Sequence, residues 1–104
     1  MEEQKIANCI YRKGSNVVFR QIGDEAILIP VANDVGDLSN IYTLTEVGTR
    51  IWEFIDGKKD VMDICKMIAG EYEAPMDVVI NDTAEFISDL KDIKFIQESN
   101  DKKY

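Results

Sequence analysis

The first part of the chain carries its apolar residues in short runs at strand spacing. Residues 17–22 and 25–31 are two such runs, and Gly23-Asp24 between them supplies the positive φ that a two-residue hairpin turn requires. The second run should end near Pro30, because proline cannot donate to a strand ladder. The pattern therefore predicts a β-hairpin.

A third strand is predicted after the hairpin. Residues 33–39 are rich in turn formers and predict a loop, and residues 40–44 predict a strand. Three consecutive strands with short connections favour an antiparallel meander, with the third strand at one edge of the sheet. This strand contains neither lysine nor proline, the residues that discourage an edge from pairing with another chain.

The apolar residues then change to helical spacing, which predicts three helices. Thr45 can cap the first helix, and Gly57 can adopt the left-handed conformation that ends it. Asp60 can cap the second helix, which Pro75 terminates before a third begins at Met76. The apolar positions are Leu44, Val47, Ile51 and Ile55 around the first helix, and Val61, Ile64, Cys65, Ile68 and Tyr72 in the second.

The third helix has a wide apolar side. One line of residues is expected to face the core, and a second line beside it exceeds what packing on one side requires. The first line is Val79, Thr83, Phe86, Leu90 and Ile93, and the second line is Ile80, Ala84 and Ile87.

These elements predict one α+β domain. At 104 residues and 45% apolar composition, the chain is long enough for one core and too short for two. We expect residues 1–16 to form a loose N-terminal arm with one apolar anchor, residues 17–96 to form the domain, and residues 97–104 to form a polar tail. Trp52, the only tryptophan, is expected in the core because its helix must bury one face against the sheet.

The composition argues against catalysis and against a metal site. Without histidine, the chain lacks the common general base near neutral pH and any Ser-His or Cys-His nucleophile. Cys9 and Cys65 do not form a paired motif, and the 6 glycines are isolated rather than grouped in a phosphate-binding loop. We therefore expect no catalytic residues, no metal and no cofactor.

The charge and hydropathy limit the partners. The formal net charge of -8 repels nucleic-acid phosphates, and no run approaches the roughly 20 apolar residues of a membrane span. The N-terminus also lacks the apolar segment of a secretory signal. These features predict a cytoplasmic protein that binds neither nucleic acid nor membrane.

Because catalysis is disfavoured, we expect the protein to act by binding a partner, and the order of the elements allows three modes of binding. A winged-helix DNA-binding regulator would place the third helix in a DNA groove, but residues 76–94 carry a net charge of 2 minus 5, or -3. Alternatively, an extended peptide would add to the free edge of the third strand and direct alternate side chains toward the third helix. In the third mode, a structural subunit would dock another protein through the wide apolar side of this helix. Most of the helix carboxylates are interpreted as a solvated face: Asp82, Glu85, Asp89 and Asp92.

An ordered set of short segments resembles a known family. The segments are Leu44-Thr45-Glu46, Ile51-Trp52-Glu53, Asp56-Gly57, Glu71-Tyr72 and Phe86-Ile87-Ser88-Asp89-Leu90. In this order they resemble the PqqD-like proteins, whose domain is also called the RiPP recognition element, and the resemblance covers about residues 17–96. It implies a winged helix-turn-helix-like fold in which a three-stranded antiparallel sheet is followed by three helices.

The resemblance also implies a non-catalytic adaptor. Family members bind the leader segment of a ribosomally synthesised precursor peptide as an added strand between the third strand and the third helix. They present it to a modifying enzyme, often a radical SAM maturase. Carried onto this sequence, the pairing strand is Ile41, Tyr42, Thr43 and Leu44, the groove wall is Ile80, Thr83, Ala84 and Ile87, and Lys91 is a candidate contact for acidic leader residues. Leu44 and Thr83 are equally compatible with core positions, because only alternate side chains of a strand can meet the peptide.

The chain departs from the family pattern in two places. Thr45 stands where the family often has Asn, and threonine is still a good helix cap. The loop over residues 33–39 is longer than usual, which would reshape one end of the groove. Nothing in the chain points specifically to pyrroloquinoline quinone biosynthesis, so the resemblance implies a leader-binding protein of unstated pathway.

Overall fold

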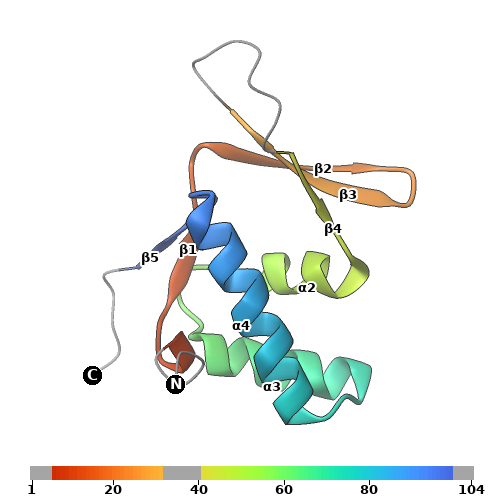
Figure 1. The fold of residues 1–104 in the computed structure, drawn as a ribbon, viewed down its shortest axis with the longest axis vertical. Helices are drawn as coiled ribbons and strands as arrows, with labels where there is room; N and C mark the ends of the chain where they lie inside the picture. Colours follow the sequence, from red (N-terminus) through yellow and green to blue (C-terminus); the bar gives the residue numbers. More distant parts are fainter. Residues whose placement is uncertain (1–5, 32–40, 100–104) are drawn as a thin grey trace.

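The computed structural model describes residues 6–31 and 41–99 (Figure 1). The first sheet consists of β2 (Val17–Ile22), β3 (Glu25–Pro30) and β4 (Tyr42–Leu44), in that order and antiparallel. The helices that follow are α2 (Glu46–Phe54), α3 (Val61–Tyr72) and α4 (Met76–Asp92). A second sheet pairs β1 (Tyr11–Lys13) with β5 (Ile96–Glu98). The predicted order of a three-stranded antiparallel sheet and three helices is confirmed.

The β2–β3 hairpin forms where the apolar pattern predicts it. Gly23 has φ 61°, the left-handed conformation that suits a tight hairpin turn. Pairing continues to Pro30, which lies opposite Val17 at the end of the strand. Ala26 and Leu28 are buried because alternate residues of β3 face the helices. The hairpin therefore presents one inner face to the core.

Side-chain caps define the starts of α2 and α3, whereas α4 follows a proline without a side-chain cap. Thr45 accepts a hydrogen bond on Oγ1 from the backbone N–H of Gly48, 2.9 Å away, at the start of α2. Asp60 and Asp63 form a reciprocal capping box at the start of α3. Pro75 immediately precedes α4, as predicted. Each cap satisfies backbone donors that the first helical turn would otherwise leave unpaired.

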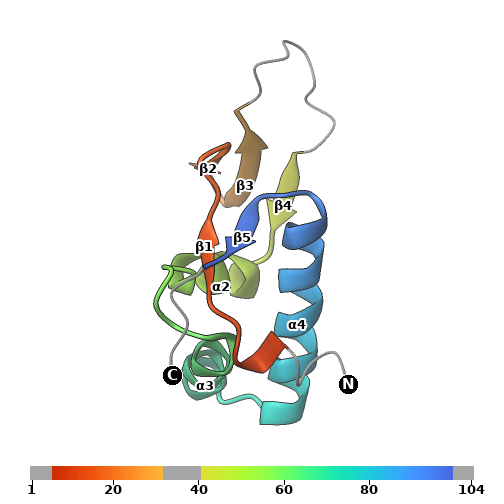
Figure 2. The ribbon, with the colours of Figure 1, turned by 90° about the vertical axis from the view of Figure 1, so that its left-hand side faces the viewer.

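The core lies between the inner face of the β2–β3–β4 sheet and the helices. Trp52 is buried within it, so its predicted position is confirmed. Figure 2 shows α4 rising from the level of α3 to the level of β4, which lets one helix contact both layers. The most completely buried large side chains are Leu28, Ile55, Ile64, Ile87, Leu90 and Phe95.

The region expected to be a loose N-terminal arm is partly incorporated into the fold. Strand β1 pairs antiparallel with β5, which itself extends into the predicted polar tail (Figure 2). Ile10 forms an isolated bridge with Asp60, and the backbone N–H of Gly57 donates to the carbonyl of Tyr11 at 2.9 Å. Gly57 has φ 80° in the turn between α2 and α3 rather than at the end of α2, where Ile55 is the C-cap. The described part of this region therefore holds the α2–α3 turn.

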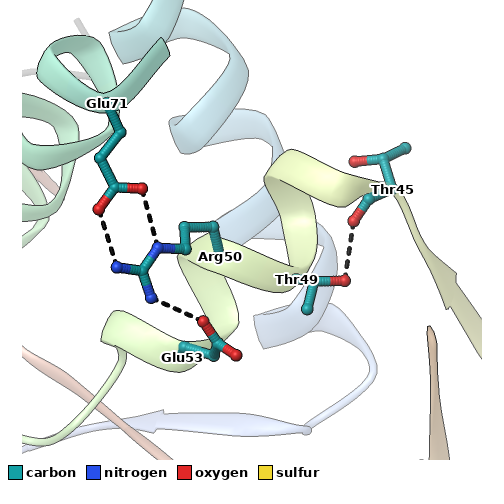
Figure 3. Close-up of polar contacts among 5 residues, drawn as sticks. All are labelled: Thr45, Thr49, Arg50, Glu53 and Glu71. Carbon is teal, nitrogen blue, oxygen red and sulfur yellow. Dashed lines mark hydrogen bonds and ion pairs between the residues drawn. The ribbon is translucent and has the colours of Figure 1, made fainter. Parts of the chain in front are cut away.

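Arg50 connects α2 to α3 at the surface (Figure 3). Its guanidinium binds both carboxylate oxygens of Glu71 at 2.8 Å and one oxygen of Glu53 at 2.7 Å. It also lies 4.4 Å from the centre of the Phe54 ring. Because these groups are exposed to solvent, we expect the ion pairs to contribute little to stability. The single positive charge of Arg50 also offsets part of the negative charge of the two carboxylates.

The burial of β3 generates a stability prediction. Replacing fully buried Leu28 by Ala should lower the free energy of unfolding by about 2–5 kcal/mol, because the lost side chain leaves a cavity. Ile22→Ala is a matched control at a side chain 65% exposed, and should change stability by less than about 0.5 kcal/mol. Urea unfolding followed by Trp52 fluorescence measures both, and equal losses would contradict this assignment of the inner and outer faces.

Candidate functional site

The candidate site is the free edge of β4 beside helix α4. In the described residues β4 pairs with β3 alone, so its other edge remains open. Tyr42 lies opposite Leu28 and Leu44 opposite Ala26, which places both on the inner face of the sheet. Thr43 points to the outer face and is exposed. The inward side chains of an added strand would therefore lie on the same face as Tyr42 and Leu44 and would point toward α4.

Tyr42 connects this edge to α4. Its ring lies edge-on to Phe86, with the ring centres 6.0 Å apart and an interplanar angle of 68°. Its hydroxyl lies 3.4 Å from Oδ2 of Asp89, a long hydrogen bond that contributes little by itself. A side chain at Gly48 would place its Cβ 3.4 Å from the Phe86 ring, so the start of α2 also packs against this junction. β4, α2 and α4 therefore meet around Phe86.

The environment of Tyr42 alters its ionisation. Burial raises the pKa of Tyr42 above its ordinary value, and the carboxylates of Asp89 and Glu85 raise this pKa further. The phenol consequently stays protonated at neutral pH and can donate to Asp89. The contact of Tyr42 with Asp89, together with exposed Glu85 one turn away, places carboxylates on the side of α4 nearest β4.

Three of the residues expected to contact a peptide lie in the core instead. Ile87 is 0% exposed, Thr83 is 1% exposed and Leu44 is 7% exposed. Ile87 therefore differs from the expectation that it lines the groove. For Leu44 and Thr83, the structure favours the core interpretation over the binding one. Leu44 is buried because alternate residues of β4 face the core. Thr83 and Ile87 are buried because they lie on the inner face of α4.

The flank of α4 that faces away from Tyr42 carries the other predicted residues: Ile80 and Ala84 of the groove wall, and the candidate contact Lys91. Lys91 places its Nζ 5.9 Å from the ring of Tyr11 in β1, not beside β4. Viewed along the helix axis, Ile80 lies about 20° from Lys91, whereas Asp89 lies about 160° from Lys91. Ala84 lies between Ile80 and Lys91 along the same stripe. Figure 1 shows the β1–β5 pair and β4 on opposite sides of α4.

The structure therefore brings together a different set of residues. Ile41, Tyr42 and Thr43 lie at or next to the open edge, and the α4 side chains in contact with Tyr42 are Phe86 and Asp89. Both residues belong to a segment that carries the family resemblance, but the sequence analysis assigned Phe86 to the core and Asp89 to a solvated face, and neither to the peptide site. The apolar pattern of α4 contained no signal for which flank faces β4.

Comparison with known proteins places the chain in a family. Residues 25–96 match the family model described as "Coenzyme PQQ synthesis protein D (PqqD)". The chain belongs to the PqqD family. The matched region of this PqqD-family protein begins at β3 and ends at the start of β5, so it contains β4 and all of α4.

Two individual proteins are similar to this PqqD-family chain. A "PqqA binding protein" from Bradyrhizobium diazoefficiens is 26% identical over 57 residues, and the match spans only 55% of this chain and 55% of that protein. The solved structure "TbiB1 in Complex with the TbiA(beta) Leader Peptide" aligns with a TM-score of 0.67 at 24% identity, covering 83% of this chain and 94% of that chain. This second similarity establishes the shared fold.

Two other classes of site are absent from residues 6–31 and 41–99. No helix there is long and apolar enough to cross a membrane. In the same residues, His, Cys, Asp and Glu side chains form no group of ≥ 3 that could hold a metal ion.

The contact between Tyr42 and Asp89 predicts a measurable titration. Asp89→Asn should lower the pKa of Tyr42, because the substitution removes a negative charge beside the phenol. The pKa should still exceed its ordinary value, since burial remains. A pH titration of ¹³C-tyrosine signals measures this change. Tyr72, whose raised pKa arises from burial and from other carboxylates, is the internal control. An unchanged Tyr42 pKa would contradict the contact.

Proposed function

We propose that this PqqD-family protein is a non-catalytic adaptor that binds the leader segment of a ribosomally synthesised precursor peptide as an added strand on β4. It then presents the precursor to a modifying enzyme, for which a radical SAM maturase is the candidate class. The observation that carries the proposal is the open edge of β4 beside α4. Binding of this kind raises the effective concentration of the precursor near its enzyme.

The geometry of the edge suits strand addition. An extended peptide gains backbone hydrogen bonds along an open edge, and its alternate side chains determine specificity. β4 carries no lysine or proline that would discourage this pairing. Tyr42 and Phe86 offer an aromatic surface to the side chains that face α4. Backbone bonds and this aromatic surface together would supply affinity without a deep pocket.

The names of the similar proteins support the same function. The relative from Bradyrhizobium diazoefficiens is named for binding PqqA, and the solved structure is titled as a complex with a leader peptide. This chain shares its family with the PqqD proteins and its fold with TbiB1. Peptide binding is therefore the function that both the site and the family favour.

The acidic face of α4 disfavours the DNA-binding alternative. A helix that enters a DNA groove needs cations to meet the phosphates. The exposed side of α4 instead carries Asp82, Glu85 and Asp89, and Lys91 lies on the flank beside Tyr11. Peptide addition to β4 requires no approach to phosphates.

Proline substitutions test the edge directly. In an antiparallel ladder, alternate residues bond to opposite neighbours, so either Tyr42 or Thr43 directs its N–H to the free edge. Proline at that position should weaken binding of the leader half of a precursor encoded beside this gene. The expected loss is about fivefold or more, because a ladder hydrogen bond is worth roughly 1 kcal/mol. Isothermal titration calorimetry measures the affinity, and a thermal melt confirms folding.

The other edge of the same sheet provides the matched control. Phe19→Pro and Arg20→Pro make the equivalent change in β2, where the proposal places no peptide. The folded β2 variants should retain the original affinity. If both β4 variants fold and bind as tightly as the unchanged protein, strand addition on β4 is contradicted.

A further inference from the structure

Three carboxylates form what we call the acidic wall of α4: Asp82, Glu85 and Asp89. Asp82 and Asp89 are two helical turns apart and about 20° apart around the axis, and Glu85 lies one turn from Asp89. All three are exposed. Asp89 contacts the Tyr42 hydroxyl and Glu85 acts on its ionisation, so the acidic wall borders the open edge of β4.

Within the described residues, the acidic wall has no basic partner. Its carboxylates form no ion pair with lysine or arginine in residues 6–31 and 41–99. Elsewhere in the described chain three carboxylates are paired: Arg50 binds Glu53 and Glu71 (Figure 3), and Lys59 binds Asp56 at 2.7 Å. A peptide placed between β4 and α4 would therefore meet three negative charges without a compensating positive charge from the described chain.

The outer face of the sheet has the opposite chemistry. Val18 lies opposite Ile29, and Ile27 lies between Thr43 and Arg20, so the outer face is mainly aliphatic but also carries these two polar residues. Ile41, just before β4, is 42% exposed. A strand added to β4 would continue both faces of the sheet, because the side chains of neighbouring strands are aligned in register. Its outward side chains would extend an apolar surface, while its inward side chains would approach α4.

We propose that the peptide bound at this edge alternates basic and aliphatic residues, with lysine or arginine facing the acidic wall. This proposal rests on the proposed function and adds the chemical class of the ligand. The two faces of an added strand meet different surroundings, so the alternation follows from charge complementarity on one face and apolar continuity on the other. It replaces the expectation that Lys91 would select acidic leader residues.

The dimensions permit several simultaneous contacts. Asp82 and Asp89 are separated by about 10 Å along the helix axis, while alternate residues of a strand are separated by about 6.7 Å. Two basic side chains on one face of the peptide can therefore reach this length of helix. Their aliphatic stems can also pack against the rings of Tyr42 and Phe86 while their charged groups reach the carboxylates.

Two synthetic peptides test the proposal. Both have twelve residues in which valine alternates with a charged residue, lysine in one peptide and glutamate in the other. We expect the lysine peptide to bind about tenfold more tightly than the glutamate peptide, since each of several exposed ion pairs contributes roughly two- to fivefold. Its affinity should fall as NaCl is raised, because salt screens exposed charges. Fluorescence anisotropy with labelled peptides measures both effects.

A triple variant assigns the selectivity to the acidic wall. D82N/E85Q/D89N should lose the preference for the lysine peptide. The control E25Q/E73Q/E98Q removes three exposed carboxylates outside α4 and makes the same change in net charge. The control should retain most of the preference, and circular dichroism confirms that both variants are folded.

The outcomes separate this proposal from the proposed function. The charge proposal is overturned if the two peptides bind equally, if neither binds, or if the two triple variants lose the preference to the same extent. In each case, binding of a precursor leader that is lost in the β4 proline variants would preserve strand addition. If the leader does not bind β4 while the lysine peptide does, the edge has the proposed chemistry and the leader-binding function fails.

Discussion

The backbone hydrogen-bonding groups along the free edge of β4 are the constraint around which the structure is arranged. A strand at the edge of a sheet has one side of its backbone unpaired, and proteins commonly cover or blunt such edges. In this chain the described N-terminal strand pairs with β5 instead of with β4. The described part of the arm is therefore paired elsewhere, and within residues 6–31 and 41–99 no strand covers the free edge of β4.

The remainder of the fold keeps α4 at a fixed position relative to that edge. The capped start of α2 follows directly from β4, and Phe86 of α4 packs near Gly48 at this junction. Arg50 ties α2 to α3, and the buried faces of α3 and α4 pack together in the core. These contacts hold the edge of β4 and α4 in a defined relative position, which is the pre-organisation that the proposed peptide binding requires.

Local sequence patterns predicted most of the fold. Strand alternation, the Gly23 turn and the caps at Thr45 and Asp60 are determined by neighbouring residues, so they could be identified without tertiary information. The pairing of β1 with β5 could not, because it joins segments from the two ends of the described chain. With three residues each, β1 and β5 are also too short to show an alternation of apolar and polar residues that would distinguish them from an arm or a tail.

The candidate site was predicted only in part for a related reason. Edge strand β4 followed from the order of the strands, and Tyr42 and Thr43 remain at the open edge. The flank of α4 that lies nearest Tyr42 did not follow, because helical periodicity defines the buried stripe while leaving two equivalent flanks beside it. The apolar side chain of Ile80 suggested one flank, whereas the contacts of Tyr42 with Phe86 and Asp89 identify the other.

The most direct test is an amide NMR titration of the ¹⁵N-labelled protein with the leader half of its precursor peptide. Addition of a strand to β4 predicts shifts concentrated at residues 41–44 and along α4 from Asp82 to Asp89, with cross-strand contacts between the peptide backbone and β4. Shifts confined to α2 and α3, or a peptide that binds as a helix, would contradict the account and identify a protein-docking surface instead.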